Sequence, residues 1–162
     1  MHESCGIFGV YAPGLDTARL VFFALFALQH RGQEAAGIAV ATGDRLEMFA
    51  NPGLVSQVFT EDYLASLKGF AAVGHTCYSA SGARRPATPQ PILEHNGRWS
   101  LALAHNGNVT NADALRDELQ ASGLVFRSQS DAEVIAKLIV TAHGATWMEK
   151  LSHALSRLQG AY

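Results

Sequence analysis

The sequence contains little cysteine, little charge and no long apolar run, and each shortage excludes a class of protein. Its two cysteines lie far apart and cannot build the disulfide framework of a small secreted domain, so we expect a reducing, cytoplasmic environment. A net charge of −2 offers no electrostatic basis for binding nucleic acid or an anionic membrane surface. The apolar run from Leu20 to Leu28 is far too short to span a bilayer, and we expect it to form a buried helix.

What the sequence does contain is enough apolar material for a domain with a hydrophobic core. The chain has 162 residues, of which 48% are hydrophobic, as in an ordinary globular protein. Its first residues lack the basic and then apolar pattern of a signal peptide. Because no repeat, low-complexity tract or Pro/Gly/Ser-rich linker divides the chain, we expect a single domain.

Local patterns predict both strands and helices. Short apolar or alternating runs between turn residues predict strands over Gly6–Tyr11, Gly37–Thr42, Leu46–Ala50, Phe70–His75 and Trp99–Ala104. A helix is expected over Thr17–Gln29, stopping near Gly32. Three later helices each begin with a hydroxyl residue followed three positions on by an acid, in the pairs Thr110 with Asp113, Ser130 with Glu133, and Thr146 with Glu149. Strands first, with helices between and after them, predict a layered α+β domain.

Cys5 is a candidate nucleophile. A thiol needs a base to react at neutral pH, because its reference pKa is about 8.5. If residues 1–4 were removed, the α-amine of Cys5, with a reference pKa of about 7.7–8.0, could take the thiol proton and later return it. The alternative is a half-buried structural cysteine at the start of the first strand, and Cys5 considered alone favours that alternative.

Three polar segments could complete a site. His105-Asn106-Gly107-Asn108 follows an apolar strand and is either a turn or, with a side-chain amide beside an unobstructed backbone N–H, an oxyanion hole. The cluster from Gln29 to Glu34 either closes a helix or faces a cleft. Asp131, at a helix start, either complements the helix dipole only or also binds an ammonium group. The residue types alone leave these alternatives open.

In order and spacing, six segments resemble the glutamine-hydrolysing domain of the amidophosphoribosyltransferase family, which belongs to the class II glutamine amidotransferases. They are CGIFGVY, LQHRGQEAAGI, GHTCYSASG, LALAHNGNVTNADALRDEL, SQSDAEVIAKLI and LQGAY. The resemblance implies a four-layer α/β/β/α sandwich of the N-terminal-nucleophile hydrolase type over residues 5–162, with residues 1–4 removed as a leader. It also implies that the sandwich is incomplete at the C-terminus, because the family's domain continues with more strands.

The resemblance assigns roles to individual residues. Cys5 would attack the side-chain amide of glutamine, with its own α-amine as the base, and form a γ-glutamyl thioester while ammonia leaves. Arg31 would support the amine end of the nucleophile. Asn106 and Gly107 would form the oxyanion hole, and Asp131 would hold the substrate α-ammonium group.

The segment GHTCYSASG departs from the family pattern at two positions. The family has Arg at the position of Cys77, where it grips the glutamine α-carboxylate, and usually Thr at the position of Ala80. Tyr78 keeps a substrate-binding position. These departures support an alternative function, a catalytically impaired amidotransferase-like fragment that acts only as a binding or structural domain. The sequence alone does not favour pairing of Cys77 with Cys5 on oxidation.

The resemblance also implies partners and cofactors. In the family, ammonia passes to a phosphoribosyltransferase domain, where it displaces pyrophosphate from phosphoribosyl pyrophosphate in the first step of de novo purine biosynthesis. That half, its Mg²⁺ and any iron–sulfur cluster lie outside this sequence, so no cofactor is expected in this chain. The expected partners are glutamine, the phosphoribosyltransferase domain and, because open sheet edges pair readily, further copies of the chain.

Overall fold

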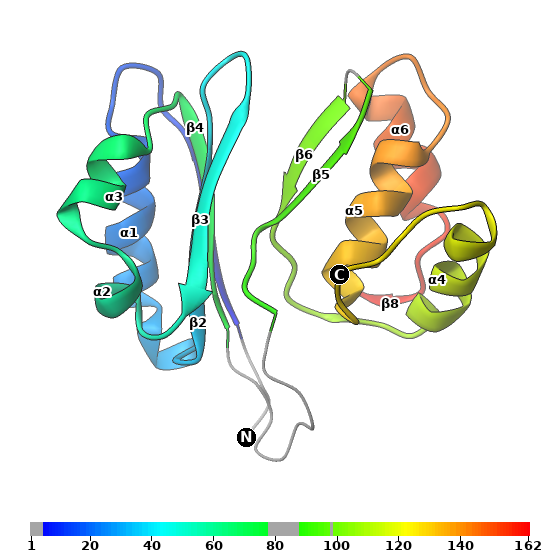
Figure 1. Cartoon of the computed structure of the whole chain (residues 1–162), viewed down its shortest axis with the longest axis horizontal. Coiled ribbons are helices and arrows are strands. Elements are labelled where there is room, and N and C mark those ends of the chain that lie inside the picture. Colours follow the sequence, from blue (N-terminus) through cyan, green and yellow to red (C-terminus); the bar gives the residue numbers. More distant parts are fainter. Residues whose placement is uncertain (1–4, 78–87, 98) are drawn as a thin grey trace. The chain divides into compact units, whose positions relative to one another are not determined.

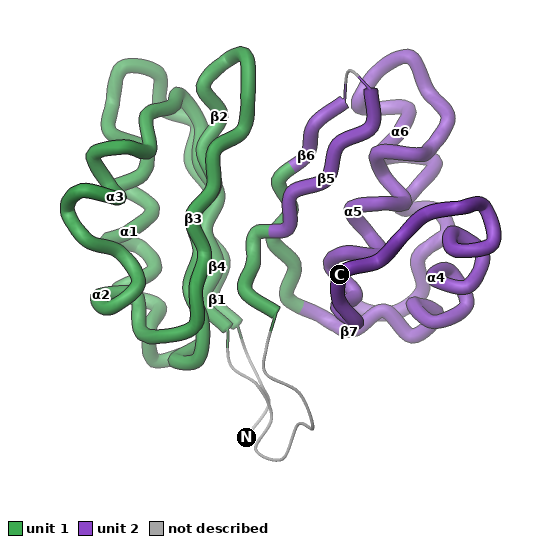
Figure 2. Tube along the Cα trace, viewed as in Figure 1, with its two compact units in different colours: residues 1–91, 102–106 green, residues 92–101, 107–162 purple. Residues whose placement is uncertain are grey.

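The computed structural model describes residues 5–77, 88–97 and 99–162. Within them, the chain divides into two compact units, which Figure 2 shows in different colours. Unit 1 takes the described residues within Met1–Pro91 and Ala102–Asn106, and unit 2 takes those within Ile92–Leu101 and Gly107–Tyr162. Each unit is described by itself.

Unit 1 contains a four-stranded antiparallel sheet (Figure 1). Its strands are β1 (Gly6–Tyr11), β2 (Ala35–Ala41), β3 (Leu46–Pro52) and β4 (Ala71–Cys77), in the order β1-β4-β2-β3. The predicted strand β1 has the predicted bounds, and the ends of the other three differ from the prediction by at most two residues. Each of these runs alternates or is continuously apolar, which is the pattern of a strand in a covered sheet.

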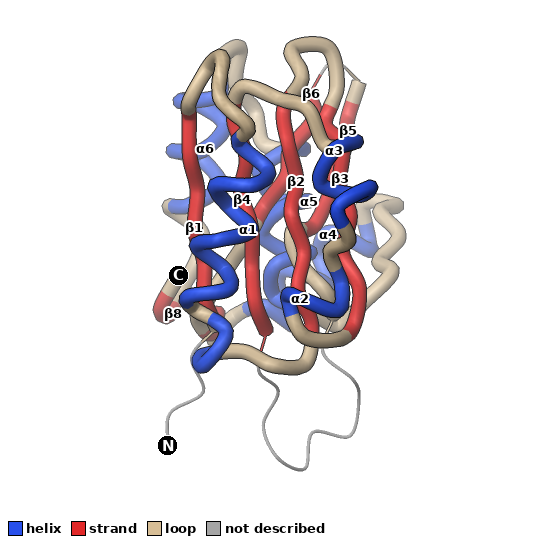
Figure 3. The backbone as a smooth tube through the Cα atoms, turned by 90° about the vertical axis from the view of Figure 1, so that its left-hand side faces the viewer, coloured by secondary structure: helices blue, strands red, loops and turns tan. Residues whose placement is uncertain are grey.

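Three helices cover one face of this sheet, as Figure 3 shows: α1 (Thr17–Ala27), α2 (Val55–Val58) and α3 (Glu61–Ser66). The side chain of Asp16 starts α1 by accepting a hydrogen bond from the backbone N–H of Arg19. Val21 and Leu25 of α1 and Ile38 of β2 are completely buried where the helix meets the sheet. The sequence did not predict α2 and α3, which are too short to show a helical period.

The prediction that the apolar run forms a buried helix is wrong for the outer face of α1. Leu20, Phe23 and Phe26 are 40%, 64% and 55% exposed. A single helix on a sheet can bury only one stripe of its surface, so a helix that is apolar all round leaves the opposite stripe uncovered.

We predict that Gly74→Ala destabilises the protein, because α1 packs directly against this residue of β4. A Cβ at Gly74 would lie 2.3 Å from Cγ1 of Val21 and 2.8 Å from Cδ1 of Leu25. We expect overpacking to lower the free energy of unfolding by about 1–3 kcal/mol or more. Gly9→Ala in the neighbouring strand is the control, since its Cβ would meet nothing closer than 3.8 Å. Equal urea midpoints for the two variants would contradict this packing.

Unit 2 consists of helices and two short sheets. β5 (Ile92–Asn96) pairs with β6 (Trp99–Leu103), whose last two residues belong to unit 1, and β7 (Asn108–Val109) pairs with β8 (Gly160–Ala161). The helices are α4 (Ala112–Ala121), α5 (Asp131–Thr141) and α6 (Trp147–Leu155). α5 is the centre of the unit: it contacts β5, α4 and α6, and its residues from Ala132 to Val140 are all buried. The sequence predicted β6 and the three helices but not β5 or β7.

The three predicted capping pairs have different outcomes. At α6 both expected bonds form, because Thr146 Oγ1 accepts from the N–H of Glu149 and the Glu149 carboxylate accepts from the N–H of Thr146, each at 3.2 Å. At α4 the prediction of Thr110 as the cap is wrong, since Asn111 occupies that position without a side-chain cap bond. At α5 the side chain of Ser130 caps the helix, but the carboxylate of Glu133 bonds elsewhere.

Each unit therefore contains both β-sheet and α-helices, in agreement with the predicted α+β class. Within the described residues, no helix combines the length and the hydrophobicity that crossing a membrane requires.

Candidate active site

Cys5 lies directly before β1 and is half-buried. The following residue, Gly6, pairs with Thr76 of β4, and its N–H donates to Thr76 Oγ1 at 3.2 Å. The backbone beside Cys5 is thus held by the sheet, which gives the side chain a defined position next to the end of β4.

Two predicted site residues converge on the carbonyl oxygen of Cys5. Arg31 Nε donates to it at 3.3 Å, and Asn106 Nδ2 donates to it at 3.2 Å. The two donors lie 26 and 101 residues from Cys5 in the sequence, so only the fold brings them there. Together the guanidinium and the amide orient the main chain of Cys5, and the bond from the charged Arg31 is the stronger type.

Arg31 reaches Cys5 from a short 3₁₀ helix, η1 (Gln29–Arg31), which follows α1. The next residue is Gly32, near which the helix was predicted to stop, and its φ of −156° is ordinary extended backbone. Glycine is needed there for space, because a Cβ would lie 2.7 Å from the carbonyl carbons of Thr76 and Cys77. This contact lets η1 approach the end of β4 and brings the guanidinium to the nucleophile.

Two other polar residues of this cluster, Gln29 and His30, have structural partners. Gln29 Oε1 accepts from the N–H of Val55 at 2.6 Å, and His30 Nδ1 lies 3.0 Å from the carbonyl oxygen of Ala27. Arg31 is thus a member of the predicted cluster that contacts Cys5 directly.

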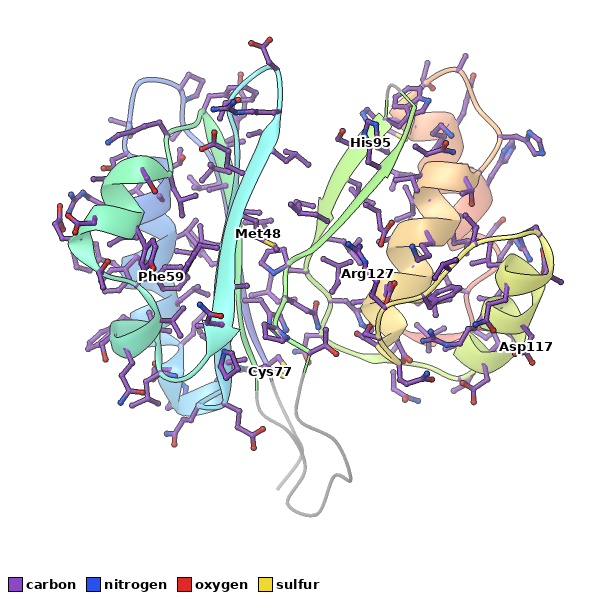
Figure 4. The ribbon with its side chains drawn as sticks, in the orientation of Figure 1. Met48, Phe59, Cys77, His95, Asp117 and Arg127 are labelled. Carbon is purple, nitrogen blue, oxygen red and sulfur yellow. The ribbon has the colours of Figure 1, made fainter. Side chains whose placement is uncertain are left out.

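Cys77 ends β4 and is labelled in Figure 4. Its side chain is 8% exposed, and its Sγ lies 3.9 Å from Sγ of Cys5. The position at which the family resemblance predicts an arginine is thus beside the sulfur of the candidate nucleophile. Tyr78 and Ala80, like the predicted leader of residues 1–4, lie outside the described residues.

The segment His105–Asn108 connects β6 to β7 and does not use left-handed backbone. Neither Asn106 nor Gly107 has a positive φ, so tolerance of left-handed backbone is not the reason for these residue types. The N–H of His105 donates to Gln90 Oε1 at 2.8 Å, which holds the segment where the amide of Asn106 reaches Cys5. Gly107 begins the part of the segment that belongs to unit 2.

Asp131 belongs to unit 2 and is the first residue of α5, as predicted. Its Oδ2 accepts from the N–H of Val109 at 2.9 Å, which ties the start of α5 to the strand after the His105–Asn108 segment. Within unit 2, the carboxylate is therefore held in a fixed position by the backbone of β7.

Two buried charged side chains hold the loop that leads into Asp131. Arg116, on α4, donates to the carbonyl oxygens of Ser128 and Ser130 at 2.8 and 3.3 Å. Glu133 accepts from the backbone N–H groups of Arg127 and Ser128 and from the Ser128 hydroxyl, at 2.6–2.8 Å. The sequence pattern did not identify Arg116. It predicted that Glu133 caps α5, because local spacing does not show that the backbone N–H groups of the preceding loop also donate to this carboxylate.

The carboxylate of Glu133 is 1% exposed, yet its surroundings favour the ionised form. Burial opposes ionisation most strongly, but the Ser128 hydroxyl, the two backbone N–H groups and the positive charge of Lys137 together hold its pKa below the usual range. Lys137 Nζ lies 3.7 Å from the Glu133 carboxylate. The loop before Asp131 thus depends on a buried negative charge.

We predict that Glu133→Gln lowers the free energy of unfolding by about 1–3 kcal/mol at neutral pH, because an amide cannot accept all three hydrogen bonds. Since the pKa of Glu133 is depressed in the folded protein, its contribution is complete above the unfolded pKa of about 4.3 and is lost as pH falls through the folded pKa. Urea unfolding at pH 7 and at pH 3 should therefore show the gap between parent and variant shrinking in acid. Exposed Asp117→Asn is the control (Figure 4); a gap independent of pH would contradict the assignment.

A groove in unit 2 and the lack of a metal site are two further features of the described residues. A groove of about 670 Å³ in unit 2 lies between α4, α5 and α6, and none of the predicted site residues lines it. No group of three or more His, Cys, Asp and Glu side chains in the described ranges could hold a metal ion.

The α+β fold and a cysteine contacted by Arg31 and Asn106 are the features of a candidate cysteine-dependent enzyme, and comparison with known proteins identifies the family. Residues 79–162, slightly more than half of the chain, match the glutamine amidotransferase domain family, so the chain belongs to that family. It is 48% identical over 162 residues to the amidophosphoribosyltransferase of Synechococcus elongatus and 42% identical over 161 residues to that of Methanocaldococcus jannaschii. These alignments cover 99% and 98% of this chain but only 33% and 34% of the relatives.

Solved structures agree with this assignment. The chain is 38% identical to a structure described as the allosteric regulatory enzyme of purine biosynthesis, with a TM-score of 0.84 over 98% of this chain and 34% of the other. It is similar, with a TM-score of 0.80, to the glutamine phosphoribosylpyrophosphate amidotransferase of Bacillus subtilis, covering 98% of this chain and 33% of that one. The resemblance and the fold class inferred from the sequence are therefore confirmed. The chain spans about a third of the length of these relatives.

Proposed function

We propose that this chain is the glutamine-hydrolysing part of an amidophosphoribosyltransferase, with Cys5 as the nucleophile after residues 1–4 are removed. The observation that carries the proposal is the convergence of Arg31 and Asn106 on the main chain of Cys5. Family membership does not favour the alternative of a purely structural or binding domain.

The proposed reaction consumes one water and releases glutamate and ammonia. The α-amine of Cys5 takes the thiol proton, Sγ attacks the side-chain carbonyl carbon of glutamine, and the proton passes to the leaving ammonia. Water then hydrolyses the γ-glutamyl thioester and restores the thiol. Because nucleophile and base belong to one residue, the hydrolysis itself requires no metal or other cofactor from this chain.

The oxyanion would be stabilised by Asn106 and Gly107. The amide of Asn106 carries two N–H donors, and one of them is used on the carbonyl oxygen of Cys5. The second can donate to the developing negative charge together with the backbone N–H of Gly107. Asp131 would bind the substrate α-ammonium group through carboxylate oxygens that the N–H of Val109 orients.

Asn106→Ala tests this arrangement. We expect kcat for glutamine hydrolysis by the leader-free protein to fall by about 10²-fold or more while KM changes little, since the amide acts on the transition state. Release of glutamate is the readout, asparagine is the substrate control, and Asn108→Ala is the matched variant two residues away. Equal kcat values for Asn106→Ala and the parent would remove Asn106 from the oxyanion hole.

The relatives support a proposal for the use of the ammonia. They are about three times longer than this chain and are amidophosphoribosyltransferases by name. We propose that ammonia from Cys5 passes to a phosphoribosyltransferase domain, which transfers it to phosphoribosyl pyrophosphate with Mg²⁺, and that the protein works in the cytoplasm as a homo-oligomer.

A further inference from the structure

The two cysteines of the chain meet at one end of the sheet in unit 1. Cys5 and Cys77 are separated by 72 residues, yet their sulfur atoms lie 3.9 Å apart. Gly6 pairs with Thr76 in the antiparallel register of β1 and β4, and continuing that register by one residue sets Cys5 opposite Cys77. They are thus cross-strand neighbours, one position beyond the last described pair of the ladder.

This position suits a covalent bond between the two sulfurs. Directly opposed residues of antiparallel strands have Cα atoms about 4.5–5.5 Å apart, and disulfides accept Cα separations of about 4.4–6.8 Å. The sulfurs must approach by about 2 Å to reach bonding distance. Rotation of the side chains, with the backbone kept in register, can supply that movement.

The two thiols differ in their access to an oxidant. Cys5 is half-buried, whereas Cys77 is buried and 8% exposed. A small oxidant therefore meets Cys5 first, and oxidation by peroxides follows exposure and thiolate character. Cys77 is then in place to attack the oxidised sulfur.

We propose that Cys5 and Cys77 form a reversible disulfide that switches off this site in response to peroxide. In the first step the Cys5 thiolate attacks one oxygen of hydrogen peroxide, giving a sulfenic acid and, after protonation, water; sulfur loses two electrons and peroxide gains them. In the second step the Cys77 thiol displaces the sulfenic oxygen as a second water and the S–S bond forms. A dithiol reductant returns both thiols by exchange.

Loss of activity on oxidation rests on the proposed function, because a sulfur held in a disulfide cannot attack glutamine. The disulfide itself depends only on the geometry of β1 and β4. The family resemblance predicts arginine at position 77, and arginine cannot form this bond, so the device belongs to chains that carry cysteine there.

The first experiment measures the bond directly on the full chain. We expect stoichiometric hydrogen peroxide to convert the reduced protein to a monomer lighter by two hydrogen atoms, with the tryptic peptides Met1–Arg19 and Gly69–Arg84 linked. Cys77→Ser should instead gain oxygen, and Cys5→Ser should remain unlinked. Because the sequence has no third cysteine, an intramolecular disulfide has one assignment. A parent protein that only gains oxygen, or links only between chains, would overturn the proposal.

The second experiment separates the switch from the proposed function. In leader-free protein, we expect glutaminase activity to fall in step with the linked fraction and to return with dithiothreitol. Each variant is compared with its own reduced activity, and Cys77→Ser should lose activity that dithiothreitol does not restore once Cys5 is over-oxidised. A disulfide that forms in a protein with no glutaminase activity would contradict the proposed function and support the disulfide. Full activity with the disulfide formed would overturn the switch.

Discussion

Removal of residues 1–4 is expected to turn on glutamine hydrolysis in a chain that is inert while they are attached. A peptide bond at the nitrogen of Cys5 converts the proposed base into an amide, which cannot take a proton from the thiol at neutral pH. A positioned general base contributes about 10²–10⁴-fold, so we expect a rise in kcat/KM of that order on processing. Intact-mass measurement of protein made in a cytoplasm, combined with release of glutamate, checks the prediction.

The matched control for this prediction is a chain that begins one residue earlier, at Ser4. It carries an α-amine, but on the wrong residue, and should be as inert as the unprocessed chain. Leader-free Cys5→Ser should also be inactive, because a hydroxyl is a far weaker nucleophile than a thiol beside the same amine. A full-length mass together with glutaminase activity would show that the α-amine of Cys5 is not the base.

Replacing Cys77 by arginine is expected to raise kcat/KM for glutamine by about 10-fold to 10³-fold. The side chain of Cys77 is buried beside Sγ of Cys5, so it lies at the site but carries no positive charge. A guanidinium can make two parallel charge-assisted bonds to a carboxylate, each contributing about 1.5–3 kcal/mol, and a thiol can make neither. With cysteine at this position, we therefore expect weak glutamine hydrolysis even from leader-free protein.

Two further variants identify the cause of that rise. Cys77→Lys supplies the charge without the planar fork and should recover only part of the increase. Cys77→Met introduces a long side chain without a charge and should recover none of the rise in kcat/KM. The rise in kcat/KM should come mainly from a lower KM with little change in kcat, because the α-carboxylate is bound equally in the ground state and in the transition state. Thermal unfolding of each variant shows whether a larger side chain at the end of β4 lowers the stability of the protein. Similar kcat/KM values for folded Cys77→Arg and the parent would refute the explanation that a missing cation weakens glutamine hydrolysis.

The sequence by itself determined the features that depend on neighbours along the chain. The strand β1 and the capping box of α6 form as predicted, because their patterns involve residues at most a few positions apart. The family also followed from the sequence, since motif order and spacing survive without coordinates. The position of Asp131 at the start of α5 belongs to the same group, because Ser130 caps that helix locally.

Only the tertiary structure decided which distant groups compete for the same partner. Glu133 does not cap α5 as predicted, because its carboxylate accepts from the backbone N–H groups of Arg127 and Ser128 in the loop before the helix. Arg116 holds that loop by donating to the carbonyl oxygen of Ser128. Gly32 is required by the backbone of β4 rather than by the end of its own helix. The convergence of Arg31, Asn106 and Cys77 on Cys5 joins four segments that are far apart in the sequence. Such contacts depend on strand register and side-chain direction, which a local pattern does not contain.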